Sequence, residues 1–291
     1  MHPAASVIIF TSLSGLGFGL LFFLGLGKPD VSGWSAFAFF FIAYALAVGG
    51  LLASTFHLGN PQRAMKAFSQ WRTSWLSREG VVAVAALLVM GLYAALLIFA
   101  DIRIAPLGWL GSVLSIIAVY CTSMIYAQLK TVPRWNMSTT PILFLLYALS
   151  GGALLSAQLH IALLLLSILT IVQILSWMRG DLSFALAGHN IETATGLGHL
   201  GKVRLLEAPH SGENYLTREM VHIIGRKHSF KLRAIAALCL GIIPIALLGV
   251  FQIDHLSVLL IIALHVIGLF TSRWLFFAEA EHVVGLYYDK R

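Results

Sequence analysis

His57, Arg63 and Glu79 are the residues of this sequence whose types and spacing are best suited to chemistry at a membrane boundary. They belong to a polar, basic and aromatic stretch, residues 57–79, that separates two apolar runs. Because each run is long enough to cross a bilayer, both ends of the stretch emerge on the same side. An imidazole at one end and a carboxyl group at the other could bind a small polar head group and exchange protons with it.

A quinone is a head group that needs both functions. Its two carbonyl oxygens become hydroxyls when two electrons and two protons are added, so its site needs a hydrogen-bond donor and a proton-exchanging group. His57 meets the first need and Glu79 the second, while Gly59 permits close approach of the backbone to a ligand. The alternative is structural: His57 ends the preceding span, and Arg63 pairs with Glu79 near a helix N-terminus.

The composition predicts a membrane protein. The 291 residues are 59% hydrophobic and only 11% charged, with a mean hydropathy of +0.88, so charges are too few to cover a water-exposed surface. We predict an all-α integral membrane protein with eight transmembrane helices in one domain, residues 1–291. The predicted spans are residues 4–26, 34–56, 80–100, 107–129, 141–156, 160–178, 232–250 and 256–277.

Basic residues are divided unequally between the two predicted membrane faces. Eight spans place both termini on one side, together with the 57–79 stretch and a long connection, residues 180–231. Of the 19 Lys and Arg residues, only Lys28 and Arg103 fall on the other side. The positive-inside rule therefore predicts a bacterial inner-membrane protein whose N- and C-termini are cytoplasmic. It also explains the net charge of +7, so we do not expect a nucleic acid partner.

Short strings recur at intervals of about 140 residues. HLG occurs at 57–59 and 199–201, LSRE at 76–79 returns as LTRE at 216–219, and LSG occurs at 13–15 and 149–151. Since the interval contains an even number of spans, we predict two parallel four-helix repeats, residues 1–135 and 136–291. The second charged stretch lacks the Pro of the first, and we assign it to partner docking through His199, Arg204 and Glu219.

His265 and Arg273 are secondary candidates for the site. They are eight residues apart in the last predicted span, so they share a helix face and could line a cavity; Arg273 could instead extend to the membrane interface. A haem needs two His residues that face each other from different spans, and only His265 lies well inside an apolar run. Cys121 and Cys239 are isolated in apolar runs. We therefore expect no haem, iron–sulfur cluster or other metal in this chain.

The segment HLGNPQRAMKAFSQWRTSWLSRE, residues 57–79, resembles the membrane-anchor subunits of the DMSO reductase family of iron–sulfur molybdoenzymes. The shared strings are HLG-x-P-x-R-A and LS-x-E. TVP-x-W at 131–135, RWLFF at the end of the last span and the eight-span layout resemble the same family, so the match covers most of the chain. The opening HPA-x-SVI-x-F-T and the string WRTSWLSRE are most similar to the branch that serves cytoplasm-facing sulfite dehydrogenases.

The resemblance implies a haem-free anchor, not catalytic alone, that binds ubiquinone or menaquinone through His57, Gly59, Arg63 and Glu79. It implies a heterotrimer with a four-cluster iron–sulfur subunit and a molybdopterin catalytic subunit. Oxidation of sulfite to sulfate is the expected reaction, and reduction of DMSO or a similar oxide is the alternative. The long charged connection departs from the plainer DMSO reductase pattern. A secondary transporter is the alternative from another class, which parallel repeats would permit.

Overall fold

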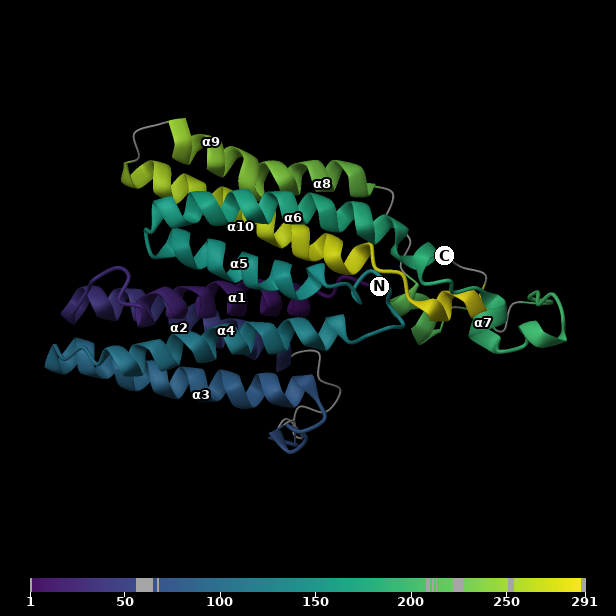
Figure 1. The fold of residues 1–291 in the computed structure, drawn as a ribbon, viewed down its shortest axis with the longest axis horizontal. Helices are drawn as coiled ribbons and strands as arrows, with labels where there is room; N and C mark the ends of the chain where they lie inside the picture. The colour runs from purple at the N-terminus through teal and green to yellow at the C-terminus, as the bar shows by residue number, and fades with distance from the viewer. Residues whose placement is uncertain are drawn as a thin grey trace.

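The computed structural model describes residues 2–55, 65–66, 68–207, 210, 212, 214–221, 228–250 and 254–288. Its long helices run side by side along one axis (Figure 1). Across these described ranges no strand occurs, so the predicted all-α class is confirmed. The N- and C-terminal ends lie at the same end of the bundle, as an even number of passes requires (Figure 1).

Within the described residues, seven helical segments are long and apolar enough to cross a membrane. The further apolar helix α5 has 17 residues, which is the lower limit for crossing the hydrocarbon. The structure thus supports seven spans by length, and eight remains a prediction. The segments are α1 (Ala5–Gly25), α2 (Gly33–Thr55), α3 with η2 (Trp75–Ala100), α4 (Ala105–Ala127), α5 (Thr139–Leu155), α6 (Leu159–Leu186), α8 with η6 and α9 (Ser229–Val250) and α10 (His255–Ala278).

Two predicted helix ends were wrong, and both errors arose from polar side chains. Helix α3 begins at Trp75 instead of residue 80, and α6 continues to Leu186 instead of ending at 178. The extra turns contain Glu79 and Asp181, which polarity alone assigned to connections. In the structure both carboxyl groups have partners on other segments, and this pairing offsets the cost of placing them in an otherwise apolar helix.

Helix α1 lies at the centre of the bundle, between α2, α4 and α5. Small residues allow these close approaches: a Cβ added at Gly17 would overlap the backbone of Ala47 in α2, and one at Gly19 would overlap the carbonyl of Ala148 in α5. Gly152 of α5 faces Gly19 in the same contact. The bundle therefore has two parts, α1 to α4 and α5 to α10 (Figure 1). They meet where α5 packs against α1 and α4 and where α10 contacts α1.

The two predicted repeats, 1–135 and 136–291, stay a prediction. Residues 76–79 lie inside α3, whereas their echo at 216–219 lies in η4 (Leu216–Met220), a short π-helical turn outside the long helices. The string at 57–59 lies outside the described residues. The one pair of similar strings that the structure describes in full, 76–79 and 216–219, therefore differs in secondary structure.

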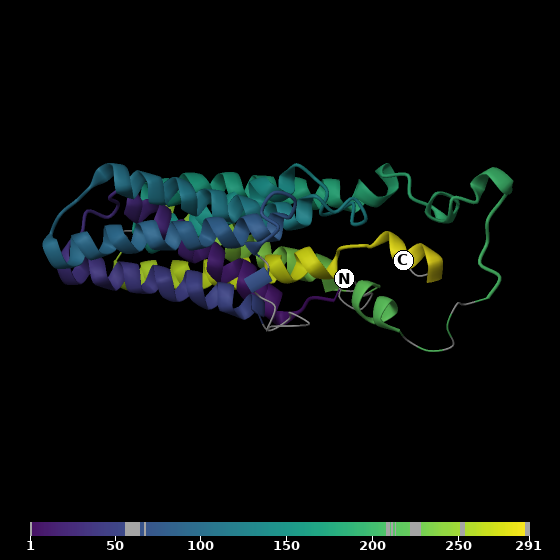
Figure 2. The same ribbon diagram turned by 90° about the horizontal axis from the view of Figure 1, so that it is seen from below.

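The predicted connection covers residues 180–231, and its described residues between α6 and α8 project beyond the end of the bundle (Figure 2). Hydrogen bonds join it to η7 (Val283–Tyr288): the Tyr287 hydroxyl donates to the Ala194 carbonyl, and the Asn214 amide donates to the Tyr288 hydroxyl at 3.1 Å. Helix α6 continues to Leu186, and the short helix α7 (Ile191–Thr195) follows it. That these helices extend outside the membrane stays a prediction.

Candidate functional site

Glu79 is a buried carboxyl group between α3 and α4. The residue is 5% exposed, and its Oε1 accepts a hydrogen bond of 2.5 Å from Thr122 Oγ1. Glu79 is buried because it continues the face of α3 that packs into the bundle at helical spacing. The buried residues of that face also include Ala83, Ala86 and Met90. A carboxyl group so placed can take up or release a proton close to the membrane surface.

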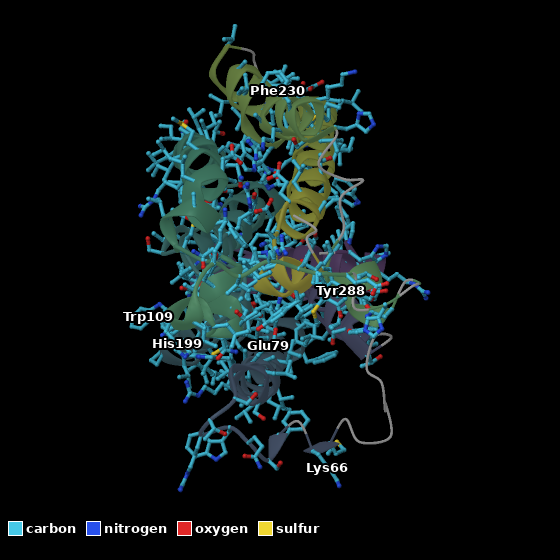
Figure 3. The ribbon with its side chains drawn as sticks, turned by 90° about the vertical axis from the view of Figure 1, so that its right-hand side faces the viewer. Lys66, Glu79, Trp109, His199, Phe230 and Tyr288 are labelled. Atoms are coloured by element: carbon cyan, nitrogen blue, oxygen red, sulfur yellow. The ribbon has the colours of Figure 1, made fainter. Side chains whose placement is uncertain are left out.

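Residues 65–66 and 68–74 form part of a connection that folds back onto the start of α3. Arg78 fixes it, since its Nε donates to the Trp71 carbonyl at 3.0 Å and its Nη2 donates to the Arg72 carbonyl at 2.6 Å. The Arg78 guanidinium also lies 4.3 Å from the centre of the Trp75 ring, a favourable cation–π distance. A basic, aromatic surface thus lies next to the buried Glu79, and Lys66 projects away from the bundle at its edge (Figure 3).

His57, Gly59 and Arg63, the other predicted members of this site, lie outside the described residues. The chain is described up to Thr55 at the end of α2 and again from residue 65. Their convergence on Glu79 therefore stays a prediction. The structure brings Thr122, a residue that was not predicted from the sequence, to Glu79. The one feature of the sequence that could have indicated Thr122 is a hydroxyl group within an apolar run.

Arg273 does not extend to the membrane interface, so of the two alternatives the structure favours the cavity. The residue is 2% exposed, and its guanidinium lies 3.7 Å from the centre of the Phe144 ring and 4.5 Å from that of Tyr147. It lines a narrow pocket of about 30 Å³ between α5, α6 and α10. The pocket is also lined by Thr140, Gln173, Ser176 and Phe276.

His265 is buried deeper along α10 and does not line this pocket. It is 1% exposed, and its Nδ1 hydrogen-bonds the Leu240 carbonyl at 2.9 Å. Its Nε2 faces α5 at Gly151 and has no hydrogen-bond partner among the described residues. His265 and Arg273 share the buried face of α10, as their spacing predicted. They have different neighbours, since His265 bonds the Leu240 carbonyl and Arg273 contacts aromatic rings of α5.

Four charged residues form a closed ion-pair network at the same end of the bundle. Arg134 contacts Asp181 at 2.6 Å and Glu279 at 3.2 Å, and Arg233 contacts the same two carboxylates at 2.6 and 2.7 Å. The network links the connection before α5 to α6, α8 and the end of α10, and it has no net charge. Sequence reasoning missed it, although an acidic residue at the end of two apolar helices was a usable signal.

The segment after α10 returns to the bundle and is not a free tail. The Val283 amide donates to the Thr131 carbonyl at 3.0 Å. The Val284 amide donates to Nδ1 of His282 at 3.0 Å, which requires that nitrogen to be unprotonated. Burial lowers the pKa of His282 below its usual range, consistent with this acceptor role.

The predicted docking residues lie on the projecting connection. His199 and Arg204 are exposed, whereas Glu219 is partly buried and its carbonyl accepts a 2.7 Å hydrogen bond from the His2 amide. Large apolar side chains are exposed near the first two: Leu200 is 75% and Leu206 is 90% exposed. Exposed apolar side chains outside the membrane-spanning helices are typical of a protein interface.

No group of three or more His, Cys, Asp or Glu side chains that could hold a metal ion occurs in the part of the chain that the structure describes. Cys121 lies in α4 and Cys239 in η6, and both are free thiols.

Comparison with known proteins was made on the whole chain. The family model described as DMSO reductase anchor subunit (DmsC) matches residues 1–278. A sulfite dehydrogenase subunit of Allochromatium vinosum is 33% identical over 99% of both proteins. The anaerobic dimethyl sulfoxide reductase protein YnfH of Escherichia coli is 31% identical over 52% of this chain and 55% of its own length. A component of the anaerobic dimethyl sulfoxide reductase of Haemophilus influenzae is 27% identical over 49% and 58%. No solved structure matches.

Proposed function

Because this chain belongs to the DMSO reductase anchor subunit family, and so anchors a DMSO reductase-type or sulfite dehydrogenase complex in the membrane, we propose that it passes electrons between the quinone pool and an iron–sulfur partner. The observation that carries the proposal is the buried Glu79 carboxyl group, hydrogen-bonded by Thr122 at the end of the bundle. A proton-exchanging group at that depth matches the needs of a quinone head group.

The chemistry is divided between the ligand and the protein. A bound ubiquinone or menaquinone supplies the two-electron, two-proton chemistry. Glu79 holds or releases a proton at its carboxyl oxygens, and Thr122 Oγ1 donates a hydrogen bond to the ionised form. His57 and Arg63 supply hydrogen-bond donors, and Gly59 gives backbone access to the ring. The chain has no redox centre of its own in this proposal, so the electrons come from the partner.

The partner docks on the projecting connection, through His199, Arg204, Glu219 and the exposed leucines beside them. The complex is a heterotrimer with a four-cluster iron–sulfur subunit and a molybdopterin subunit. Of the 19 Lys and Arg residues, Arg273 lies inside the bundle and only Lys28 and Arg103 fall on the other side. The positive-inside rule therefore favours a cytoplasmic location of the connection and both termini in a bacterial inner membrane.

Sulfite is the substrate that we propose for the catalytic partner. The relative named for sulfite dehydrogenase aligns with this chain from end to end, whereas the two relatives named for DMSO reductase align with about half of it. Reduction of DMSO or a similar oxide by quinol is the second candidate. The purified complex should reduce a ubiquinone analogue with sulfite, and reduction of DMSO by quinol without sulfite oxidation would favour the second candidate.

The His57→Ala variant tests the quinone site. We expect the complex to assemble and to oxidise its substrate with an artificial electron acceptor, but to lose quinone-coupled turnover, because only the second activity needs the ring to be held. His160→Ala is the matched control, since this exposed imidazole lies at the start of α6 and belongs neither to the proposed quinone site nor to the proposed docking surface. Equal loss of both activities in His57→Ala would show a structural role instead.

A reporter fused to the C-terminus tests the topology. A fluorescent protein that matures only in the cytoplasm should be fluorescent, and alkaline phosphatase, which needs the periplasm, should be inactive at the same position. Periplasmic activity would reverse the side on which the partner is placed.

A further inference from the structure

A pocket of about 400 Å³ lies between the connection before α5 and the last turns of α6. We call it the Lys130 pocket. Its lining includes Lys130 and Asn136 from the connection, Arg179, Ser183 and Leu186 from α6, and His189 just beyond that helix. Helix α6 leads towards α7 at the end of the bundle where both termini lie (Figure 1). This is the end that we predict to face the cytoplasm.

The Lys130 pocket has positive charge and no acidic residue in its lining. Lys130 and Arg179 are exposed, and His189 adds a partly buried ring. Neither cation belongs to the ion-pair network nearby, in which Asp181 and Glu279 are already shared by two other arginines. A pocket with two cationic side chains and no carboxylate attracts an anion, and phosphate oxygens are suitable acceptors for both.

One face of α6 is apolar and exposed up to the last residue of the helix. Its members recur at intervals of three and four residues, as one helix face requires. They are Ile168, Ile171, Leu175, Met178, Leu182 and Leu186, and they are between 40% and 80% exposed. In a membrane-spanning helix such a face meets the acyl chains of lipids. Leu186 also lines the Lys130 pocket, so the basic pocket is continuous with the lipid-facing surface.

We propose that the Lys130 pocket binds the head group of an anionic phospholipid, whose acyl chains lie along the apolar face of α6. Lys130 and Arg179 contact the phosphate oxygens. A soluble anion would make no use of the apolar face, and a docked protein would not reach the part of that face inside the membrane. Basic pockets on the cytoplasmic side of transmembrane helices are suited to anionic lipid head groups. The site is separate from Glu79 and does not depend on quinone chemistry.

Native mass spectrometry of the full chain in detergent tests the proposal, with phosphatidylglycerol as the probe. The chain should bind this lipid more tightly than phosphatidylethanolamine with the same acyl chains, because the second head group has no net charge. The double variant Lys130→Gln with Arg179→Gln should weaken binding about 25-fold, about fivefold for each charge removed near the membrane surface. Both side chains are exposed, so folding should persist.

The matched control is the double variant Lys202→Gln with Arg218→Gln. It removes two exposed cations of the projecting connection, outside the pocket, and should leave phosphatidylglycerol binding unchanged. Equal loss of binding in the two double variants would show general attraction between the lipid and a basic protein, and would overturn the site.

A further variant tests the acyl chains separately from the charges. Leu186→Gln changes a side chain that is 80% exposed, and it should weaken phosphatidylglycerol binding about fivefold through lost apolar contact. Glycerol 3-phosphate, which has the phosphate without acyl chains, should not compete; effective competition would overturn the lipid in favour of a soluble anion. Unchanged lipid binding by the Lys130→Gln, Arg179→Gln variant, with loss of the iron–sulfur partner from the purified complex, would overturn it in favour of a protein docking surface.

Discussion

The Glu79 region and the Arg273 pocket each hold an ionisable side chain inside the helical bundle, but the two side chains have different kinds of partner. Glu79 has one hydroxyl partner, Thr122, at 2.5 Å. Arg273 contacts two aromatic rings, and its Nε has no hydrogen-bond partner within the described ranges. A carboxyl group can lose its charge by taking a proton, whereas a guanidinium cannot. The first arrangement therefore suits proton exchange, and the second suits a permanent contact.

The two regions are close enough to be connected through aromatic side chains. Tyr126 lies one turn after Thr122 on α4, and its ring packs 5.7 Å from that of Phe144, whose ring also contacts Arg273. Tyr126 is surrounded by Trp135, Phe276 and Phe277 as well. This cluster separates the carboxyl group from the guanidinium, which keeps their chemistry distinct.

The largest expected effect comes from Glu79→Gln. The amide keeps the size of the side chain and can still accept a hydrogen bond from Thr122, but it cannot exchange protons. Quinone-coupled turnover of the complex should fall by about 10³-fold, the scale of a lost proton-transfer group. Activity with an artificial electron acceptor should change little. Retention of quinone turnover would remove the chemical distinction between the two regions.

The ion-pair network at the mouth of the Arg273 pocket offers a matched pair of substitutions. Glu279 and Asp181 contact the same two arginines, but their side chains are 4% and 45% exposed. Glu279→Gln should lower the free energy of unfolding by about 3 kcal/mol, because it leaves buried arginine charge unpaired. Asp181→Asn should cost less than about 1 kcal/mol, because water solvates the same pairs.

Denaturant unfolding of the purified protein in detergent measures both changes. Quinone-coupled turnover of the two variants, measured below their unfolding transitions, should stay near that of the parent protein. Equal destabilisation by the two substitutions would show that burial does not set the strength of this network.

The helix positions followed from the sequence, because apolar runs are a local property. Helix α1 occupies residues 5–25 where 4–26 was predicted. The errors at α3 and α6 came from Glu79 and Asp181, whose partners Thr122 and Arg134 are distant in the chain. Glu79 could be named as a candidate from its flanking residues alone. Its burial, and the two rings around Arg273, depend on which helices pack together, which the sequence pattern does not specify.

Helix α1 packs against α5, the helix that carries Phe144 and Tyr147 of the Arg273 pocket. Two glycines of α1 test how tightly these helices pack. A methyl group at Gly19 would overlap the Ala148 carbonyl, whereas one at Gly15 meets nothing within 4 Å. Gly19→Ala should therefore lower the free energy of unfolding by about 2 kcal/mol through overpacking. Gly15→Ala, on the same helix, should be neutral or slightly stabilising. Similar values for both variants in detergent would show that α1 and α5 separate easily.

Thr122→Val tests how far the chemistry of Glu79 depends on the hydroxyl group that hydrogen-bonds to it in the described part of the chain. Valine has the shape of threonine, so packing between α3 and α4 should persist while the hydrogen bond to the carboxyl group is lost. Quinone-coupled turnover should fall by about tenfold, near the lower limit for a hydrogen bond to a charged group. Thr122→Ser restores the hydroxyl and should recover most of the activity. Full quinone-coupled turnover of Thr122→Val would show that Glu79 exchanges protons without this hydrogen bond.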